Sequence, residues 1–266
     1  MRQWKKAHLE KMQEFINTVQ STGDINSVKQ DELLLAPRDP RTENMCITPA
    51  SQYDWSPSTM EAYPRIIHQV WVGPYRQPDD CLKMQAYAFK HGYAYRLWTD
   101  GDIDELCLDL PPHVRDVITN NLRSKRVRGA SNVMRYCAIY KYGGIYFDAD
   151  YVPRQDCLAP HEFIPTTGLS ATTEWGARQI GADCGSLFLE NSLICSAPGH
   201  SMLKRCIDST SKNDAMSIEQ WGGVTTLGTG PFLFTACAYG CFSIIVPRTL
   251  YAQFDRVNHN GNLQLK

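Results

Sequence analysis

Runs of apolar residues separated by polar turns predict alternating strands and helices from residue 64 onward. Arg65 to Val72 is a nearly continuous apolar run bounded by proline and glycine, as expected for a strand buried on both faces. Residues 79–91 carry apolar side chains at helical spacing and end at a glycine, and residues 93–98 predict a second strand. This strand–helix–strand order indicates a parallel βαβ unit and therefore an α/β domain.

The stretch from Gly129 to Asp150 organises the rest of the chain. Its first part places apolar residues on one helical face, at Val133, Cys137 and Tyr140. The pair Gly143-Gly144 predicts the end of this helix, because glycine readily adopts the left-handed conformation found past a last turn. Residues 145–147 are β-branched or aromatic and predict a short buried strand.

Two carboxylates follow this strand, Asp148 and Asp150. In extended backbone their spacing puts both side chains on one side, about 7 Å apart. Such a pair can hold a hard divalent cation that is shared with a phosphate group. A solvated turn is the better interpretation of an isolated Asp-X-Asp, but this pair closes a helix–glycine–strand unit and is flanked by aromatic residues.

The remaining pattern completes a main domain over residues 63–266, preceded by an extension over residues 1–62. The extension reads as an amphipathic helix over 4–19 and then a proline-rich wrap or tether. The main domain adds a helix over 111–122, strands over 168–175, 185–189 and 243–246, a helix over 202–207, and a helix that begins at Thr229-Gly230-Pro231. Its glycine-rich segments lack the Lys-Ser/Thr of a phosphate-binding loop.

Composition narrows the classes of function. The chain has 266 residues, 43% of them hydrophobic, which is enough for a full core. Its net charge of −1 gives no overall attraction to nucleic acid or anionic membrane. The ten cysteines form no Cys-x-x-Cys, so a structural zinc site is not expected, and no apolar stretch is long enough to cross a membrane. The start lacks a signal-peptide core, so we expect a cytoplasmic protein, or a protein of the secretory-pathway lumen if an N-terminal anchor was removed.

Charge is uneven along the chain and points to the Asp pair. Between residues 110 and 147 one acid, Asp116, accompanies seven basic residues: Arg115, Arg123, Lys125, Arg126, Arg128, Arg135 and Lys141. A basic stretch that leads into two carboxylates fits a site for a metal-bound diphosphate. A solvated basic helix is the preferred interpretation for Arg123, Lys125 and Arg126, but not for Arg135. His68 lies in the middle of a predicted buried strand, so we expect a core histidine.

The central stretch resembles the sugar transferases that contain a DXD motif, glycosyltransferase family 32 with its fungal α-mannosyltransferases and vertebrate α-galactosyltransferases. A more distant resemblance is to the glucosylating domain of large clostridial toxins. The motif is matched at Ser131, Arg135, Tyr136, Tyr140, Gly143, Gly144, Tyr146, Asp148 and Asp150. The chain departs from it at Asn132, where the family usually has Asp. The strand around residues 64–71 and the segment around 191–200 also resemble the family.

The resemblance implies a GT-A-like fold, a mixed and mostly parallel sheet with helices on both faces. It implies transfer of a hexose from UDP- or GDP-hexose to a hydroxyl of a glycan, glycolipid or protein acceptor, with retention of configuration and with Mn²⁺ or Mg²⁺ on the diphosphate. Two alternatives stay open. One is a non-catalytic nucleotide-sugar-binding protein on the same scaffold, which the change at Asn132 favours. The other is a metal-dependent phosphohydrolase, which would need further ligands near the Asp pair.

Residue roles follow from the resemblance. Asp150 would bind the metal directly, Asp148 would bridge the metal and the donor, and Asn191 joins them as a catalytic residue. Asn132 and Arg135 would hold donor hydroxyls and a phosphate, so we expect Arg135 to serve donor binding more than stability. Val70, Trp71 and Tyr146 complete the donor site, with Trp71 either stacked on the base or a core aromatic. From the tail, His259 or Asn260 would close over the metal.

Overall fold

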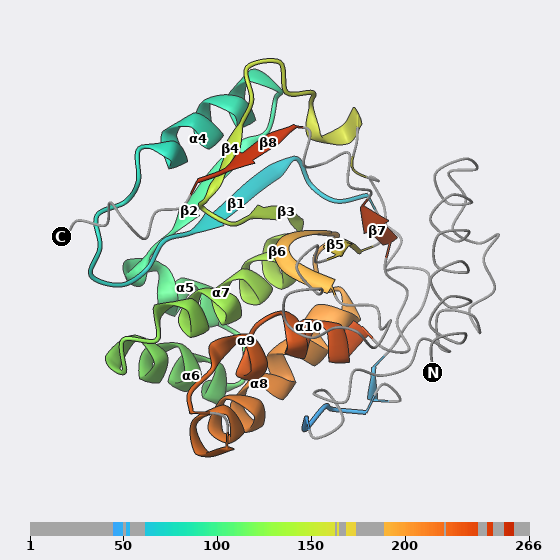
Figure 1. The fold of residues 1–266 in the computed structure, drawn as a ribbon. Coiled ribbons are helices and arrows are strands. Elements are labelled where there is room, and N and C mark those ends of the chain that lie inside the picture. Colours follow the sequence, from blue (N-terminus) through green and yellow to red (C-terminus); the bar gives the residue numbers. More distant parts are fainter. Residues whose placement is uncertain are drawn as a thin grey trace, which may run out of the picture.

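The computed structural model describes the main domain and parts of the segment before it (Figure 1). It describes residues 45–49, 52–53, 62–162, 164, 169–173, 189–220, 222–238, 244–246 and 253–257. Three predictions lie outside the described residues: the amphipathic helix over 4–19, the greater part of the strand over 185–189, and the tail residues His259 and Asn260.

A six-stranded mixed sheet forms the centre of the domain. Its strands lie in the order β2 (Ala94–Trp98), β1 (Ile66–Val70), β3 (Gly144–Phe147), β6 (Leu189–Ser196), β5 (Ser170–Thr173) and β7 (Ile244–Val246). β1 pairs in parallel with both β2 and β3, and β5 pairs in parallel with β7. β6 runs antiparallel to both β3 and β5. The predicted α/β class and the mixed sheet are therefore confirmed.

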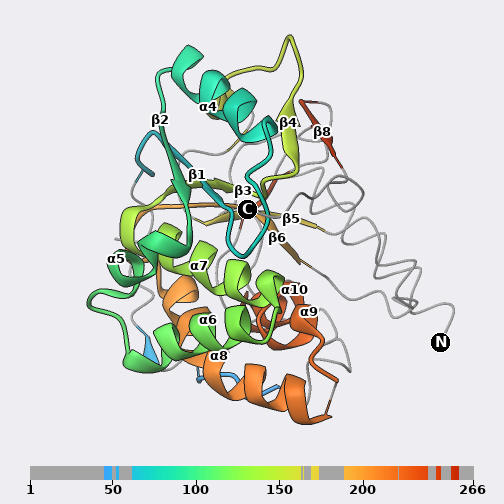
Figure 2. The ribbon, with the colours of Figure 1, turned by 90° about the vertical axis from the view of Figure 1, so that its left-hand side faces the viewer.

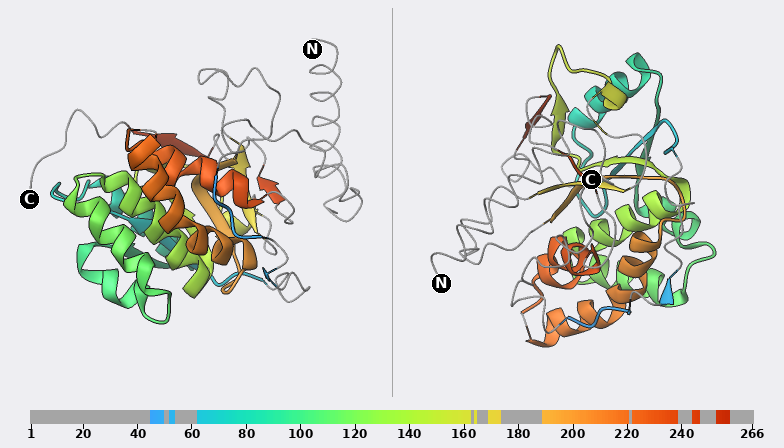
Figure 3. Two further views of the ribbon diagram at one scale, coloured as in Figure 1. Left: turned by 90° about the horizontal axis from the view of Figure 1, so that it is seen from below. Right: turned by 90° about the vertical axis from the view of Figure 1, so that its right-hand side faces the viewer.

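Helices cover both faces of this sheet, unequally (Figure 2). One face carries α4 (Asp80–Lys90) and a two-stranded ribbon of β4 (Tyr151–Pro153) and β8 (Phe254–Arg256). The opposite side holds α6 (Pro112–Arg123), α7 (Val127–Tyr142), α8 (Ser201–Gln220), α9 (Thr225–Gly228) and α10 (Pro231–Ala238) (Figure 3). Short elements complete the chain: η4 (Asp100–Asp102), α5 (Ile103–Cys107) and η5 (Pro160–Glu162).

Helix α7 is more deeply buried than its pattern predicted. Ten of its residues are buried, from Gly129 to Ile139, because α5, α6, α8 and the sheet surround it. It ends as predicted at Gly143, where φ is 64°, and the chain turns directly into β3. Gly144 has φ 91°, and an added Cβ there would lie 2.5 Å from the Ile66 carbonyl oxygen. The glycine pair thus lets the buried helix run straight into a buried strand beside β1.

Two hydrophobic clusters, one on each side of the sheet, hold the layers together. The larger packs helices α5, α6, α7, α8 and α10 against the sheet, and it includes the buried cysteines Cys137 and Cys206. The smaller joins α4 and the β4–β8 ribbon to β1 and β3, with Phe254 from β8 packed against Phe147 and Tyr151. Since β1 and β3 contribute to both clusters, they have the two-sided burial that their apolar runs predicted.

Two elements differ from their predicted extent. β6 continues to Ser196, so the segment around Asn191 is a strand beside β3. The helix predicted over 202–207 extends to Gln220 as α8, which packs against α6, α7, α9 and α10. Among the described residues no helix is long and apolar enough to cross a membrane.

Candidate active site

The functional side chains gather at one edge of the sheet, where β1 and β3 end. These strands are parallel, with His68 opposite Tyr146, so their carboxyl ends meet and bring Trp71 near Asp148. β6 runs the other way, so it begins at this edge, and the Asp148 amide donates to the Ser192 carbonyl at 2.8 Å. A cavity of about 640 Å³ opens here between the sheet edge, α7 and the start of α10.

The Asp pair lies in a turn and not in extended backbone. β3 ends at Phe147, and the Tyr151 amide closes the turn by donating to the Asp148 carbonyl at 3.1 Å. The expectation of a strand-like spacing was therefore wrong, because the ladder with β6 stops at Phe147. Both carboxylates nevertheless line the same cavity, as predicted.

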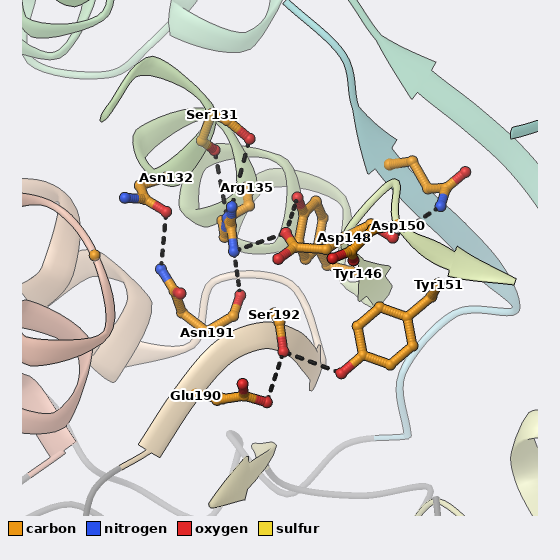
Figure 4. Close-up of polar contacts among 12 residues, drawn as sticks. Ser131, Asn132, Arg135, Tyr146, Asp148, Asp150, Tyr151, Glu190, Asn191 and Ser192 are labelled. Atoms are coloured by element: carbon orange, nitrogen blue, oxygen red, sulfur yellow. Dashed lines mark hydrogen bonds and ion pairs between the residues drawn. The ribbon is translucent and has the colours of Figure 1, made fainter. Parts of the chain in front are cut away.

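Arg135 is built into the wall of the cavity. Its guanidinium lies 2.9 Å from the Asp148 Oδ1 atom, donates to the Asn191 carbonyl at 2.6 Å, and stacks on the Tyr146 ring (Figure 4). The side chain is only 6% exposed. Burial lowers the pKa of this guanidinium, but Asp148 and the neighbouring tyrosines outweigh it and leave the pKa raised, so the charge is secure. Arg135 therefore supports the Asp turn and β6, and it also lines the cavity, so the expectation that it serves donor binding more than stability stays a prediction.

Tyr146 shares this role. It is fully buried, and its hydroxyl donates to the Asp148 Oδ1 atom at 2.8 Å. Burial raises the pKa of the Tyr146 hydroxyl far above its ordinary value, which keeps it a proton donor. Tyr146 and Arg135 both contact the Oδ1 atom of Asp148. The other carboxylate oxygen, Oδ2, makes neither of these contacts and is the outward oxygen of Asp148.

Asn132 and Asn191 belong to one buried hydrogen-bond network. The Asn191 amide donates to the Asn132 side-chain oxygen at 3.2 Å and to the Tyr136 hydroxyl at 2.8 Å. The Asn132 amide donates to the Thr229 hydroxyl at 3.3 Å, and Tyr136 donates to the Thr229 carbonyl. The network connects α7, β6 and the Thr229-Gly230-Pro231 segment, and both asparagines line the cavity. An aspartate at position 132 could not donate to Thr229, so asparagine suits this network.

Trp71 and Val70 occupy the end of β1. Trp71 is partly exposed and lines the cavity, and its indole donates to the Tyr75 carbonyl at 3.0 Å. Its partial exposure argues against a core aromatic, and stacking on the base of a donor stays a prediction. Val70 is 4% exposed and contributes apolar surface beneath it.

Arg256 is a site residue that the sequence analysis missed. It lies on β8, and its guanidinium donates to the Asp150 Oδ2 atom at 2.9 Å and to the Glu190 Oε1 atom at 3.2 Å. The Asp148 Oδ2 atom is 3.7 Å away, and the Tyr151 ring lies beneath the guanidinium. The three residues of β8, Phe-Asp-Arg, are too few to show a strand pattern, so the sequence offered no signal for Arg256. Glu190 also accepts from Ser192, which contacts the Tyr151 hydroxyl (Figure 4).

Few of the basic residues before the Asp pair reach the cavity. Arg128 and Arg135 line it. Arg126 instead forms a buried ion pair with Asp214 on α8, at 3.0 Å, which corrects its interpretation as a solvated residue. Arg115 pairs with Asp104 on the surface, away from the cavity.

His68 is the core histidine that was predicted. Its Nδ1 atom accepts from the Trp98 indole at 3.0 Å, and its Nε2 atom lies 2.9 Å from the Gly143 carbonyl. Since the indole can only donate, the proton of the neutral ring is on Nε2. Burial lowers the pKa of His68 to about 4, so the ring is neutral at ordinary pH.

The Asp pair suits a hard divalent cation in ligand type, but it is an incomplete set. Carboxylate oxygens are preferred by Mg²⁺ and Mn²⁺. Among the described residues no three His, Cys, Asp or Glu side chains are grouped closely enough to hold a metal ion. Of the described residues, a cation would therefore take the two carboxylates of the Asp pair, with phosphate oxygens and water as further ligands.

Comparison with known proteins found similar solved structures and one matching protein family. Similar solved structures include "PaToxG Glycosyltransferase" (15% identity, 68% of this chain and 70% of that chain, TM-score 0.49). Others are a UDP-bound glycosyltransferase domain from the YGT toxin (9%, 70% and 80%, 0.41) and the catalytic domain of alpha-toxin from Clostridium novyi (9%, 67% and 63%, 0.37). Likenesses this distant carry no argument about substrate, and no curated protein matches the chain. Residues 78–169, which contain Arg135 and both aspartates, match the family described as a glycosyltransferase sugar-binding region containing a DXD motif.

Proposed function

We propose that this protein is a metal-dependent glycosyltransferase that moves a hexose from a nucleotide sugar to an acceptor hydroxyl. One observation carries the proposal. Asp148 and Asp150, both within the matched region, lie in a turn at the end of β3 and line a cavity of about 640 Å³. A cavity of this size is in the range that takes a nucleotide-sized ligand. The family match, to a sugar-binding region, supports a sugar donor as the ligand.

The residues around the cavity have separable roles in this proposal. Asp150 and the outward oxygen of Asp148 would hold Mn²⁺ or Mg²⁺, whose chemistry is to offset the charge of the leaving diphosphate. Arg135 and Tyr146 fix Asp148 in place. Asn132 and Asn191 form a polar wall that can meet donor hydroxyls, and Trp71 offers an aromatic surface for the base.

The donor is proposed as UDP- or GDP-hexose, and the acceptor as a glycan, glycolipid or protein hydroxyl. Retention of anomeric configuration belongs to the same proposal and rests on the motif resemblance. NMR of the product's anomeric proton would test it. An inverted product would contradict retention and leave the transfer reaction standing.

The test is a panel of UDP- and GDP-hexoses screened by thermal shift with and without Mn²⁺, followed by assays of donor hydrolysis and transfer. We expect one donor to raise the melting temperature only with Mn²⁺ and to be turned over. Asp150→Asn should abolish turnover. The matched control is Asp156→Asn, which alters an exposed carboxylate outside the cavity and should leave turnover unchanged. Equal turnover by wild type and Asp150→Asn would contradict the proposal.

A non-catalytic nucleotide-sugar-binding protein is the second candidate, and the state of Asn132 favours it. Its side chain is uncharged, 5% exposed and bonded at both ends to Thr229 and Asn191. Such a residue offers the donor less than the aspartate of the motif. Tight donor binding with no hydrolysis or transfer, in the same panel, would select this candidate.

A further inference from the structure

Arg256 neutralises an acidic cluster that it does not fully balance. Three carboxylates face it, from Asp148, Asp150 and Glu190, at 3.7, 2.9 and 3.2 Å. Arg135 is the second cation, and it touches only Asp148 within this cluster. Three negative and two positive charges leave a net charge of −1 within this cluster.

The backbone around Arg256 is fixed, so any rearrangement here belongs to the side chain. Two residues earlier, Phe254 is 3% exposed and packs on Phe147 and Tyr151. One residue later, the Val257 amide donates to the Asp150 carbonyl at 2.9 Å. Between these two anchors the Arg256 side chain is 37% exposed and lines the cavity.

A divalent cation and the Arg256 guanidinium need the same oxygens. The Asp150 Oδ2 atom accepts two bonds from Arg256, and the outward oxygen of Asp148 faces the same guanidinium. A cation bound there would meet a fixed positive charge unless the guanidinium moved to another anion. A diphosphate in the cavity is such an anion, because guanidinium binds phosphate oxygens in the same forked geometry as carboxylates.

We propose that Arg256 is an exchangeable counter-ion, which pairs with Asp150 in the empty site and transfers to the donor's diphosphate in the loaded site. The inference rests on the proposed function, because it takes the diphosphate from there. The exchange makes cation and nucleotide binding mutually dependent. The cation binds weakly by itself and tightly once the diphosphate has accepted the guanidinium.

The experiment measures binding, not turnover. Mn²⁺ alone is titrated by electron paramagnetic resonance, and then UDP and GDP are each titrated by calorimetry at saturating Mn²⁺. In Arg256→Met we expect Mn²⁺ alone to bind about five- to tenfold more tightly, since the competing charge is gone. We expect the nucleotide to bind roughly 10- to 100-fold more weakly, since a charge-assisted contact is lost. Arg154→Met is the matched control, because Arg154 bonds to Asp255, the neighbour of Arg256 on β8, but does not line the cavity. This variant should change neither affinity.

The expected changes in Mn²⁺ affinity and in nucleotide affinity have opposite signs, and this distinguishes exchange from a structural role. A merely structural Arg256 would weaken both affinities when it is replaced, and that result would overturn the proposal. Arg256→Lys, which keeps the charge without the fork, should give a Mn²⁺ affinity between wild type and Arg256→Met. Nucleotide affinity that is unchanged in Arg256→Met would overturn the exchange alone. Wild-type protein that binds neither nucleotide would overturn the proposed function and the exchange with it.

Discussion

Two arginines serve the same pair of carboxylates, yet they are held in opposite ways. Arg135 lies on α7, the helix that precedes the aspartates in the sequence, and its side chain is 6% exposed. It is bonded to Asp148, to the Asn191 carbonyl and to the backbone and hydroxyl of Ser131. Arg256 comes from the far end of the chain, is 37% exposed, and bonds only to side-chain carboxylates while resting on the Tyr151 ring.

The difference shows that one site combines two parts. Arg135, Tyr146 and Asp148 form a rigid half, and Asp150 and Arg256 form an adjustable half. Removing a buried ion-pair partner is costly because the other charge stays buried, whereas a partly exposed pair is screened by water. Arg135 therefore fixes the position of the Asp turn, and Arg256 can change partners at low cost. Four experiments would break or sharpen this contrast, and they run from the largest expected effect on unfolding free energy to the smallest.

Replacing Arg135 should destabilise the protein most. Arg135→Ala removes the partner of Asp148 and the donor to the Asn191 carbonyl, so we expect unfolding free energy to fall by about 3–5 kcal/mol. Urea unfolding followed by circular dichroism measures the change. A loss below about 1 kcal/mol would mean that Arg135 is no more structural than Arg256, and the contrast would fail.

The two aspartates should separate in the same way. Asp148→Asn weakens the bonds from Arg135 and Tyr146 and should cost about 1.5–3 kcal/mol. Asp150→Asn weakens the partly exposed pair with Arg256 and should change stability by less than about 1 kcal/mol, while abolishing transfer. Both variants are compared by urea unfolding and by the transfer assay. Equal stability losses would contradict the division into a rigid and an adjustable half.

The buried core beside the site should also respond to acid, through His68. The pKa of His68 is lowered to about 4 by burial, below its ordinary value of about 6.5, so between these values the unfolded chain binds a proton that the folded chain does not. The stability that depends on neutral His68 is complete above pH 6.5 and is lost as pH falls toward 4. At pH 5 the loss should be on the order of 2 kcal/mol relative to pH 7.5. His68→Gln should reduce this pH dependence, and an unchanged dependence would assign it to other groups, such as buried His200.

Replacing Arg256 should have the smallest effect on stability. Arg256→Met breaks only partly exposed ion pairs, and β8 keeps its anchor at Phe254, so the change should stay within about 1 kcal/mol. The thermal midpoint and urea midpoint of this variant provide the measurement, beside Arg154→Met as the control. A loss as large as that of Arg135→Ala would place Arg256 in the rigid half.

Most of the rigid half could be predicted from the sequence because it is local. The apolar run before Gly73, the glycine pair after α7 and the strand that leads to Asp148 follow one another in a continuous pattern, and each element forms where its pattern places it. The motif also identified Arg135 and Tyr146. Their roles could not be predicted, because the number of bonds a side chain makes, and hence whether it serves the fold or a ligand, depends on burial.

The adjustable half depends on pairings that sequence patterns do not encode. Arg256 and Asp150 are 106 residues apart, and β8 is a three-residue strand whose partner β4 is equally short. Likewise Arg126, the residue just before α7, pairs with Asp214 on α8, 88 residues away. Neither short strands nor isolated charges carry periodicity, so only the folded chain reveals these partners.

The β4–β8 ribbon has a consequence for the order in which a ribosome makes the site. Asp150 is synthesised 106 residues before Arg256, which at cellular elongation rates is a delay of roughly 5–20 s. During this interval the acidic turn has no Arg256 to neutralise it, and Phe147 and Tyr151 have no Phe254 to cover them. Until β8 is made, the nascent chain therefore exposes an aromatic surface beside a negatively charged turn. We expect a chaperone to bind at that surface.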